Sequence, residues 1–329
     1  MDYLTAAGWP WLADPIARLR AAGAADRLPH SLLILAAPGL GAAELAAWAG
    51  AFALCEAEAA ARPCGECGSC ALLRADAHPD WHAVRVEEDA QQIKVDQVRA
   101  LIESLAQKSY RGGYKVGLIE GAEALNANGA NAFLKTLEEP TARTLLMLTA
   151  ARSHRLPPTV ASRCLKLALR PPERETALAW LRSQSGEADG WEAPLALSGG
   201  APLRAIELRR AGVAELDAEM RRGLADLVAG RLDLTVLAER WVRADPAPRV
   251  AWLENWVTTR ILAGVAGPND SKTAESVRLP AGARGPKITA MYALLDAIRD
   301  FRRLATTGVN PQLALEALLL RVRSLSSGT

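Results

Sequence analysis

The chain has 329 residues, with 39 lysines and arginines against 37 aspartates and glutamates, and a formal net charge of +2. This near balance does not favour a protein that binds nucleic acid alone through a strongly basic face. No apolar run reaches the roughly 20 residues of a membrane span, and the N-terminus lacks the basic start and apolar core of a signal peptide. We therefore expect a cytoplasmic protein of two or three domains, each able to bury a core.

The first informative stretch is a degraded phosphate-binding loop. Residues 32–44 read LLILAAPGLGAAE and predict an apolar strand, a turn around Gly39 and Gly41, and the start of a helix. In the intact pattern GxxxxGK[ST], backbone N–H groups cradle phosphates, the lysine reaches them, and the hydroxyl holds Mg²⁺. The stretch also fits any strand, glycine-rich turn and helix of an α/β protein. The diagnostic positions here hold Ala36, Gly41, Ala42 and Ala43.

Four cysteines follow the helix predicted for residues 44–54. They are Cys55 at the helix end and, in two interlocked C-x-x-C steps, Cys64, Cys67 and Cys70. Four sulfurs suit tetrahedral Zn²⁺ in a closed, structural site. Two disulfides or four unrelated buried thiols are the alternatives, but this spacing in a cytoplasmic chain favours zinc. His78 is a further ligand candidate, for which a role in a turn is the favoured interpretation.

The next elements lead to a second degraded motif. Alternation predicts a strand over 81–86, Asp96 is a candidate N-cap of the helix that follows, and residues 115–119 form another predicted strand. After such a strand, an ATPase places one carboxylate on Mg²⁺ and another near the attacking water. Here the pair is Glu120 and Gly121, so the second carboxylate is missing. We predict neither ATP binding nor ATP hydrolysis by this chain.

The stretch NANGANAFLKTLEEP, residues 126–140, resembles the AAA+ subunits of bacterial sliding-clamp loaders. Glu138 and Glu139 within it could be interpreted as a catalytic carboxylate pair, but a solvated or structural role at a helix end is favoured. A strand predicted for 144–149 follows. In the family, a residue at the position of Thr149 senses the γ-phosphate, and with no nucleotide expected we predict a structural role for it.

The segment LPPTVASRC, residues 156–164, completes this resemblance. In clamp-loader subunits, the Ser-Arg-Cys motif presents its arginine to ATP held by the neighbouring subunit. The resemblance therefore implies that Arg163 is an arginine finger acting in trans, a group that stabilises charge on the transferring phosphoryl group. On three letters alone, an ordinary surface arginine is the alternative. The order of the motifs favours the finger.

The remaining sequence predicts helices. A helix over 173–182, a loop over 183–190 and two short helices within 195–208 resemble the AAA+ lid, where Arg204 is either a nucleotide-sensing arginine or a solvated one. Longer helices are predicted for 216–227, 235–243, 249–263, 287–306 and 311–324, with a long loop or mobile insertion over 264–286. Three tryptophans have core-like spacing and favour packing over base stacking: Trp241, Trp252 and Trp256.

The closing stretch, residues 307–322, again resembles clamp-loader subunits, whose C-terminal helices form a collar. Apolar stripes of this kind also close an ordinary helical bundle. The resemblance thus implies a RecA-like α/β AAA+ domain over 1–168 with a zinc module at about 55–70, a helical lid over 169–210, and an all-helical collar over 211–329.

The implied function is that of a non-hydrolysing, stationary subunit of a bacterial clamp loader in DNA replication. Its implied partners are motor subunits of the gamma or tau type and a delta subunit, with the sliding clamp and primer-template DNA reached through the complex. A diverged motor subunit with residual ATPase activity is the leading alternative. A nucleic-acid-binding protein built on a zinc knuckle ranks lower, because residues 64–70 contain no aromatic residue.

Overall fold

The computed structural model describes residues 8–87, 90–151, 156–186, 189–265, 288–304 and 310–326. The chain forms two compact units, one of residues 1–186 with 200–204 and the other of residues 187–199 with 205–329. Within the described ranges, no helix is long and apolar enough to cross a membrane. The predicted division into three domains at residues 168 and 210 stays a prediction.

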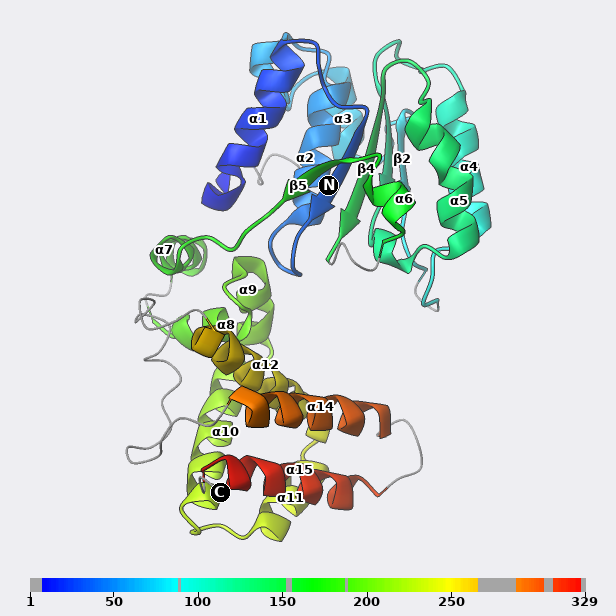
Figure 1. The fold of residues 1–329 in the computed structure, drawn as a ribbon. Coiled ribbons are helices and arrows are strands. Elements are labelled where there is room, and N and C mark those ends of the chain that lie inside the picture. Colours follow the sequence, from blue (N-terminus) through cyan, green and yellow to red (C-terminus); the bar gives the residue numbers. More distant parts are fainter. Residues whose placement is uncertain are drawn as a thin grey trace. The chain divides into compact units, whose positions relative to one another are not determined.

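The first unit contains a five-stranded parallel sheet in the order β2-β3-β4-β1-β5 (Figure 1). The three inner strands are nearly continuous apolar runs, as expected where helices cover both faces of a sheet. The predicted strands are confirmed, although β2 ends two residues early. The strands are β1 (Ser31–Leu35), β2 (Trp81–Val84), β3 (Lys115–Ile119), β4 (Thr144–Ala150) and β5 (Leu165–Ala168).

Helices cover both faces of this sheet. Helix α2 (Ala42–Leu54) packs on one face and is flanked by α1 (Ala13–Ala24) and α3 (Gly68–Arg74). The other face carries α4 (Val95–Ala106), α5 (Ala127–Glu138) and the short α6 (Pro158–Ala161); α4 and α5 lie to the right of the sheet in Figure 1. Ten consecutive residues of α2, from Leu45 to Leu54, are buried, so this helix is a central part of the core.

Several predicted boundaries are wrong by two or three residues, and two of them have a clear local cause. The N-cap of α4 is Lys94 rather than Asp96, because the side chain of Gln97 accepts a hydrogen bond from the Lys94 N–H at 2.9 Å. Asp96 lies in the first turn, where a carboxylate still favours the helix through the macrodipole. Helix α7 (Arg174–Ser185) extends three residues into the predicted loop, and its serine hydroxyls bond to carbonyls of the preceding turn.

The second unit is a helical bundle. Helix α9 (Pro202–Arg210) begins in the first unit and ends in the second. One apolar core includes Trp241 and Trp252, which are 1% and 4% exposed, and Trp256 packs against it, confirming that the three tryptophans serve packing. The loop predicted for 264–286 lies outside the described residues from 266 onward. The helices are α8 (Glu192–Leu197), α10 (Val213–Val228), α11 (Leu234–Arg243), α12 (Pro246–Val265), α14 (Ile288–Leu304) and α15 (Pro311–Ser326).

Candidate functional site

The degraded phosphate loop connects β1 to α2 with the predicted strand, turn and helix. Gly39 and Gly41 have φ of +85° and +86°, a left-handed conformation that glycine adopts without steric cost. Gly41 is the N-cap of α2, and Ala42 and Ala43 occupy its first turn. The loop therefore keeps its backbone shape. Methyl groups stand where a cation and a hydroxyl would contact a nucleotide.

The start of α9 packs directly on this loop within the first unit. Leu203 N–H donates a hydrogen bond to the Gly39 carbonyl at 3.2 Å. A Cβ atom added to Gly39 would lie 2.4 Å from Cβ and 2.5 Å from the backbone nitrogen of Arg204. Gly39 is thus required by a protein contact as well as by its φ. Arg204 is exposed, and its backbone contacts the loop at Gly39.

Tryptophans from the N-terminal arm cover the other part of the loop. Trp11 Nε1 donates to the Leu40 carbonyl at 3.0 Å, and a Cβ on Gly41 would lie 2.6 Å from Cζ3 of Trp9. Trp180 of α7 meets both rings edge-on, with centroid distances of 5.9 Å to Trp9 and 4.9 Å to Trp11. Nothing local in the sequence indicates that these two tryptophans pack on the loop.

The second degraded motif follows β3 at Glu120 and Gly121. Gly121 adopts φ +66°, and its N–H donates to Oγ1 of Thr149 at 3.1 Å. Thr149 is only 7% exposed. The hydroxyl predicted to be structural is therefore bonded within the chain. It lies beside the position where the missing carboxylate would have been.

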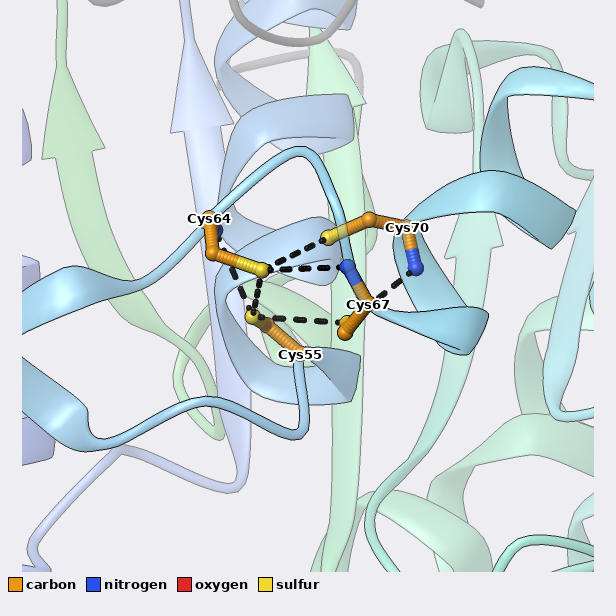
Figure 2. Close-up of side chains that lie close together, drawn as sticks. All are labelled: Cys55, Cys64, Cys67 and Cys70. Atoms are coloured by element: carbon orange, nitrogen blue, oxygen red, sulfur yellow. Dashed lines mark hydrogen bonds between the residues drawn. The ribbon is translucent and has the colours of Figure 1, made fainter.

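The four predicted metal ligands come together. Figure 2 shows the sulfurs of Cys55, Cys64, Cys67 and Cys70 pointing toward one another, Cys55 from the end of α2 and Cys70 from α3. All four sulfurs lie within 4.8 Å of one another, and three of their separations are 3.6, 3.9 and 4.0 Å. A tetrahedron with Zn–S bonds of about 2.3 Å has sulfur–sulfur edges of about 3.8 Å. None of the four forms a disulfide.

The surroundings of the cysteines also suit thiolates bound to a cation. The backbone N–H groups of Glu66 and Cys67 donate to the Cys64 sulfur and lower its pKa to about 6. Burial raises the pKa of Cys55 to about 12, so this thiol needs a nearby positive charge to ionise. A divalent cation supplies that charge. The cluster could therefore hold a metal ion.

His78 lies outside the cysteine cluster and in the turn that was predicted. Its carbonyl accepts from Trp81 N–H at 3.1 Å, its Nδ1 accepts from Asp80 N–H, and its Nε2 lies 3.1 Å from Ser69 Oγ. Ser69 Oγ donates to Glu56 Oε1, so the histidine donates to the serine and does not activate it. This chain of bonds ties the turn between Cys67 and Cys70 to the start of β2. The sequence did not reveal it.

The predicted arginine finger follows α6 and is fixed at its backbone. Ser31 Oγ donates to the Arg163 carbonyl at 2.7 Å, which ties the residue to the start of β1. The adjacent Cys164 is buried, and burial raises the pKa of its thiol to about 11. The Ser-Arg-Cys motif therefore combines a buried cysteine with an arginine whose side chain is 35% exposed.

The Arg163 guanidinium contacts Glu138 at the end of α5. Its Nε donates to Glu138 Oε1 at 2.6 Å, and its Nη2 lies 2.5 Å from the same oxygen. Its Nη1 donates to the Thr159 carbonyl at 2.8 Å. Nothing in the sequence connects Glu138 with Arg163. They lie 25 positions apart, and only the packing of α6 on α5 brings them together.

Comparison with known proteins finds one family model, described as DNA polymerase III, delta subunit, that matches residues 12–173. The DNA polymerase III delta-prime subunit of Pseudomonas aeruginosa is 37% identical over 303 residues, covering 90% of this chain and 92% of that protein. The Escherichia coli delta-prime subunit is 31% identical over 323 residues and 95% of each chain. The tau subunit of Salmonella typhimurium is 32% identical, but over 44% of this chain and 22% of its own.

Proposed function

Because the chain belongs to the family of DNA polymerase III delta-prime subunits, we propose that it is a stationary clamp-loader subunit that assists ATP hydrolysis in a neighbouring subunit. As a family member it is a component of the DNA polymerase III holoenzyme and has an AAA+-like fold. The similarity to delta-prime subunits spans nearly the whole chain, whereas the similarity to tau covers less than half of it. This difference favours a stationary role over that of a motor.

The first part of the proposal is an inert nucleotide site. Ala42, Ala43 and Gly121 lack the groups that would contact phosphate, Mg²⁺ and the attacking water. The Trp9 ring and the backbone of Arg204 press against the two loop glycines. These contacts support a loop that packs against the chain itself and not against a nucleotide. By itself, this subunit is not an ATPase.

The second part is a trans arginine finger at Arg163, and the observation that carries it is an accessible guanidinium on a fixed backbone. The carbonyl is held by Ser31, while the side chain is 35% exposed. An arginine finger stabilises transition-state charge on the transferring phosphoryl group and contributes about a thousandfold or more to the rate. A rigid backbone helps because a small misplacement of a charged group lowers its catalytic effect.

The test is the Arg163→Ala variant assembled with motor subunits, a delta subunit, sliding clamp and primer-template DNA. We expect ATP turnover at the adjoining motor site to fall on the order of a thousandfold, with slower clamp loading. Arg18→Ala is the matched control, since this arginine pairs with Asp14 on α1 and its side chain is 71% exposed. Unchanged ATPase and loading rates in the assembled Arg163→Ala complex would refute the finger.

The third part is a structural Zn²⁺ bound by Cys55, Cys64, Cys67 and Cys70. The supporting observation is the sulfur spacing, which matches a tetrahedral site with no ligand position left open. The metal would hold the turn before α3 against the end of α2. Protein purified without chelator is expected to contain one zinc per chain. Its absence from metal analysis would contradict the proposal.

The fourth part concerns assembly. We assign residues 169–210 to a lid and 211–329 to a collar that joins the motor subunits and the delta subunit in the cytoplasm. Apolar side chains exposed on the last two helices support this assignment, since Tyr292, Leu313 and Leu320 are 49%, 62% and 48% exposed. Leu313→Ser with Leu320→Ser is expected to reduce co-purification with those subunits. Undiminished co-purification would remove these side chains from the interface.

A further inference from the structure

We propose that Glu138 is a positioning residue for Arg163, which orients the guanidinium so that its terminal N–H groups point outward. This inference rests on the proposed finger function. Its basis is geometric, because one carboxylate oxygen, Glu138 Oε1, contacts both Nε and Nη2 of Arg163 at 2.6 and 2.5 Å. Two contacts to one edge of a planar group fix its direction as well as its distance.

The donors of the guanidinium divide into a held set and an outward set. An arginine side chain has five N–H donors. Nε–H donates to Glu138 Oε1, Nη2 lies 2.5 Å from the same oxygen, and Nη1 donates to the Thr159 carbonyl at 2.8 Å. Nη1 also donates a longer hydrogen bond, 3.5 Å, to Ser162 Oγ, and Nη2 has no acceptor other than Glu138 among the described residues. The end formed by Nη1 and Nη2 thus remains able to bind an anion.

That remaining end suits a phosphoryl group. Two N–H donors on adjacent nitrogens form the fork with which arginine binds phosphate oxygens in a bidentate manner. The guanidinium is held by the carbonyl of Thr159 on α6 and by the carboxylate of Glu138 at the end of α5. Arg163 therefore keeps a donor pair for an external anion while its other edge is bonded within the chain.

The position of Glu138 in its helix supports a role beyond helix stability. It is the last residue of α5, where the carbonyl end of the macrodipole disfavours a carboxylate. Glu139 follows as the C-cap and is also exposed, but among the described residues only Glu138 forms an ion pair with Arg163. Glu138 and Glu139 are thus adjacent, exposed carboxylates at the same helix end, and Glu138 binds Arg163. This pair provides a matched comparison.

The experiment compares Glu138→Ala with Glu139→Ala in the fully assembled clamp loader, measuring steady-state ATPase against MgATP concentration. An ion pair that is 35% and 48% exposed has a modest strength, so we expect Glu138→Ala to lower kcat at the adjoining site by roughly two- to fivefold. The KM for ATP is expected to stay within about twofold, because the motor subunit binds the nucleotide. Glu138→Gln keeps an acceptor oxygen and is expected to recover part of the loss, and Glu139→Ala to match the wild type.

The outcomes separate this inference from the finger itself. If Arg163→Ala lowers the rate while Glu138→Ala leaves it unchanged or raises it, the finger stands and the positioning role is refuted. If Arg163→Ala has no effect, the finger itself fails, whatever the Glu138 variants do. An equal loss in Glu138→Ala and Glu139→Ala would show a general charge effect and would also refute positioning. Unchanged thermal unfolding of the variants excludes a folding defect as the cause.

Discussion

Replacing Gly39 with alanine tests whether the degraded loop is a packing element. Alanine at φ +85° costs about 1–2 kcal/mol, because its Cβ crowds the carbonyl in the left-handed region. The new Cβ would also lie 2.4 Å from Cβ and 2.5 Å from the nitrogen of Arg204, so backbone must move, which costs a further ~1–3 kcal/mol. We expect Gly39→Ala to lower the free energy of unfolding by about 2–5 kcal/mol in total.

A matched variant isolates the contact from the strain. Gly121 also has a positive φ, +66°, but a Cβ added there meets no atom within 4 Å among the described residues. Gly121→Ala should therefore cost only the left-handed strain, about 1–2 kcal/mol. Urea unfolding followed by tryptophan fluorescence measures both variants. If Gly39→Ala were no more destabilising than Gly121→Ala, the claim that α9 packs on the loop would be wrong.

Three further predictions concern the first unit. Extracting metal with a strong chelator is expected to lower the melting temperature, and Cys64→Ser should lower it similarly and abolish the chelator effect. Lys115→Met removes a buried donor to the carbonyls of Leu105 and Gln107, and the free energy of unfolding should fall by about 1–3 kcal/mol in denaturant titrations. Burial lowers the pKa of His82, so below about pH 6.5 the unfolded chain binds a proton that the folded chain resists, and stability falls with decreasing pH. His82→Asn should unfold with a shallower loss of stability between pH 7.5 and 5.5, and an identical pH profile would contradict this assignment.

Local patterns predicted most of the first unit. The strands β1 and β3 are short, mainly apolar runs that are each followed by a turn containing glycine, so their positions follow from the sequence. The cysteine cluster could also be predicted, because the four cysteines lie within 16 positions and their spacing is typical of a metal site. The N-cap of α4 could not be predicted in this way. Lys94 is the N-cap, and its backbone N–H donates to the side chain of Gln97.

Contacts between distant segments could not be predicted in the same way. Glu138 and Arg163 meet because two helices pack, and Trp9 reaches Gly41 because an N-terminal arm folds over the loop. Neither contact leaves a periodicity or spacing in the sequence. Motif comparison identified which nucleotide-binding groups are missing. It did not show that tryptophan rings and the start of α9 cover the glycines that remain.

The proposed stationary role requires that this chain binds no nucleotide of its own. The most direct measurement is calorimetric titration of the isolated full-length protein with MgATP, with phosphate release measured on the same sample. The account predicts neither saturable binding nor turnover. Saturable MgATP binding with measurable hydrolysis would contradict it and identify the chain as a motor subunit.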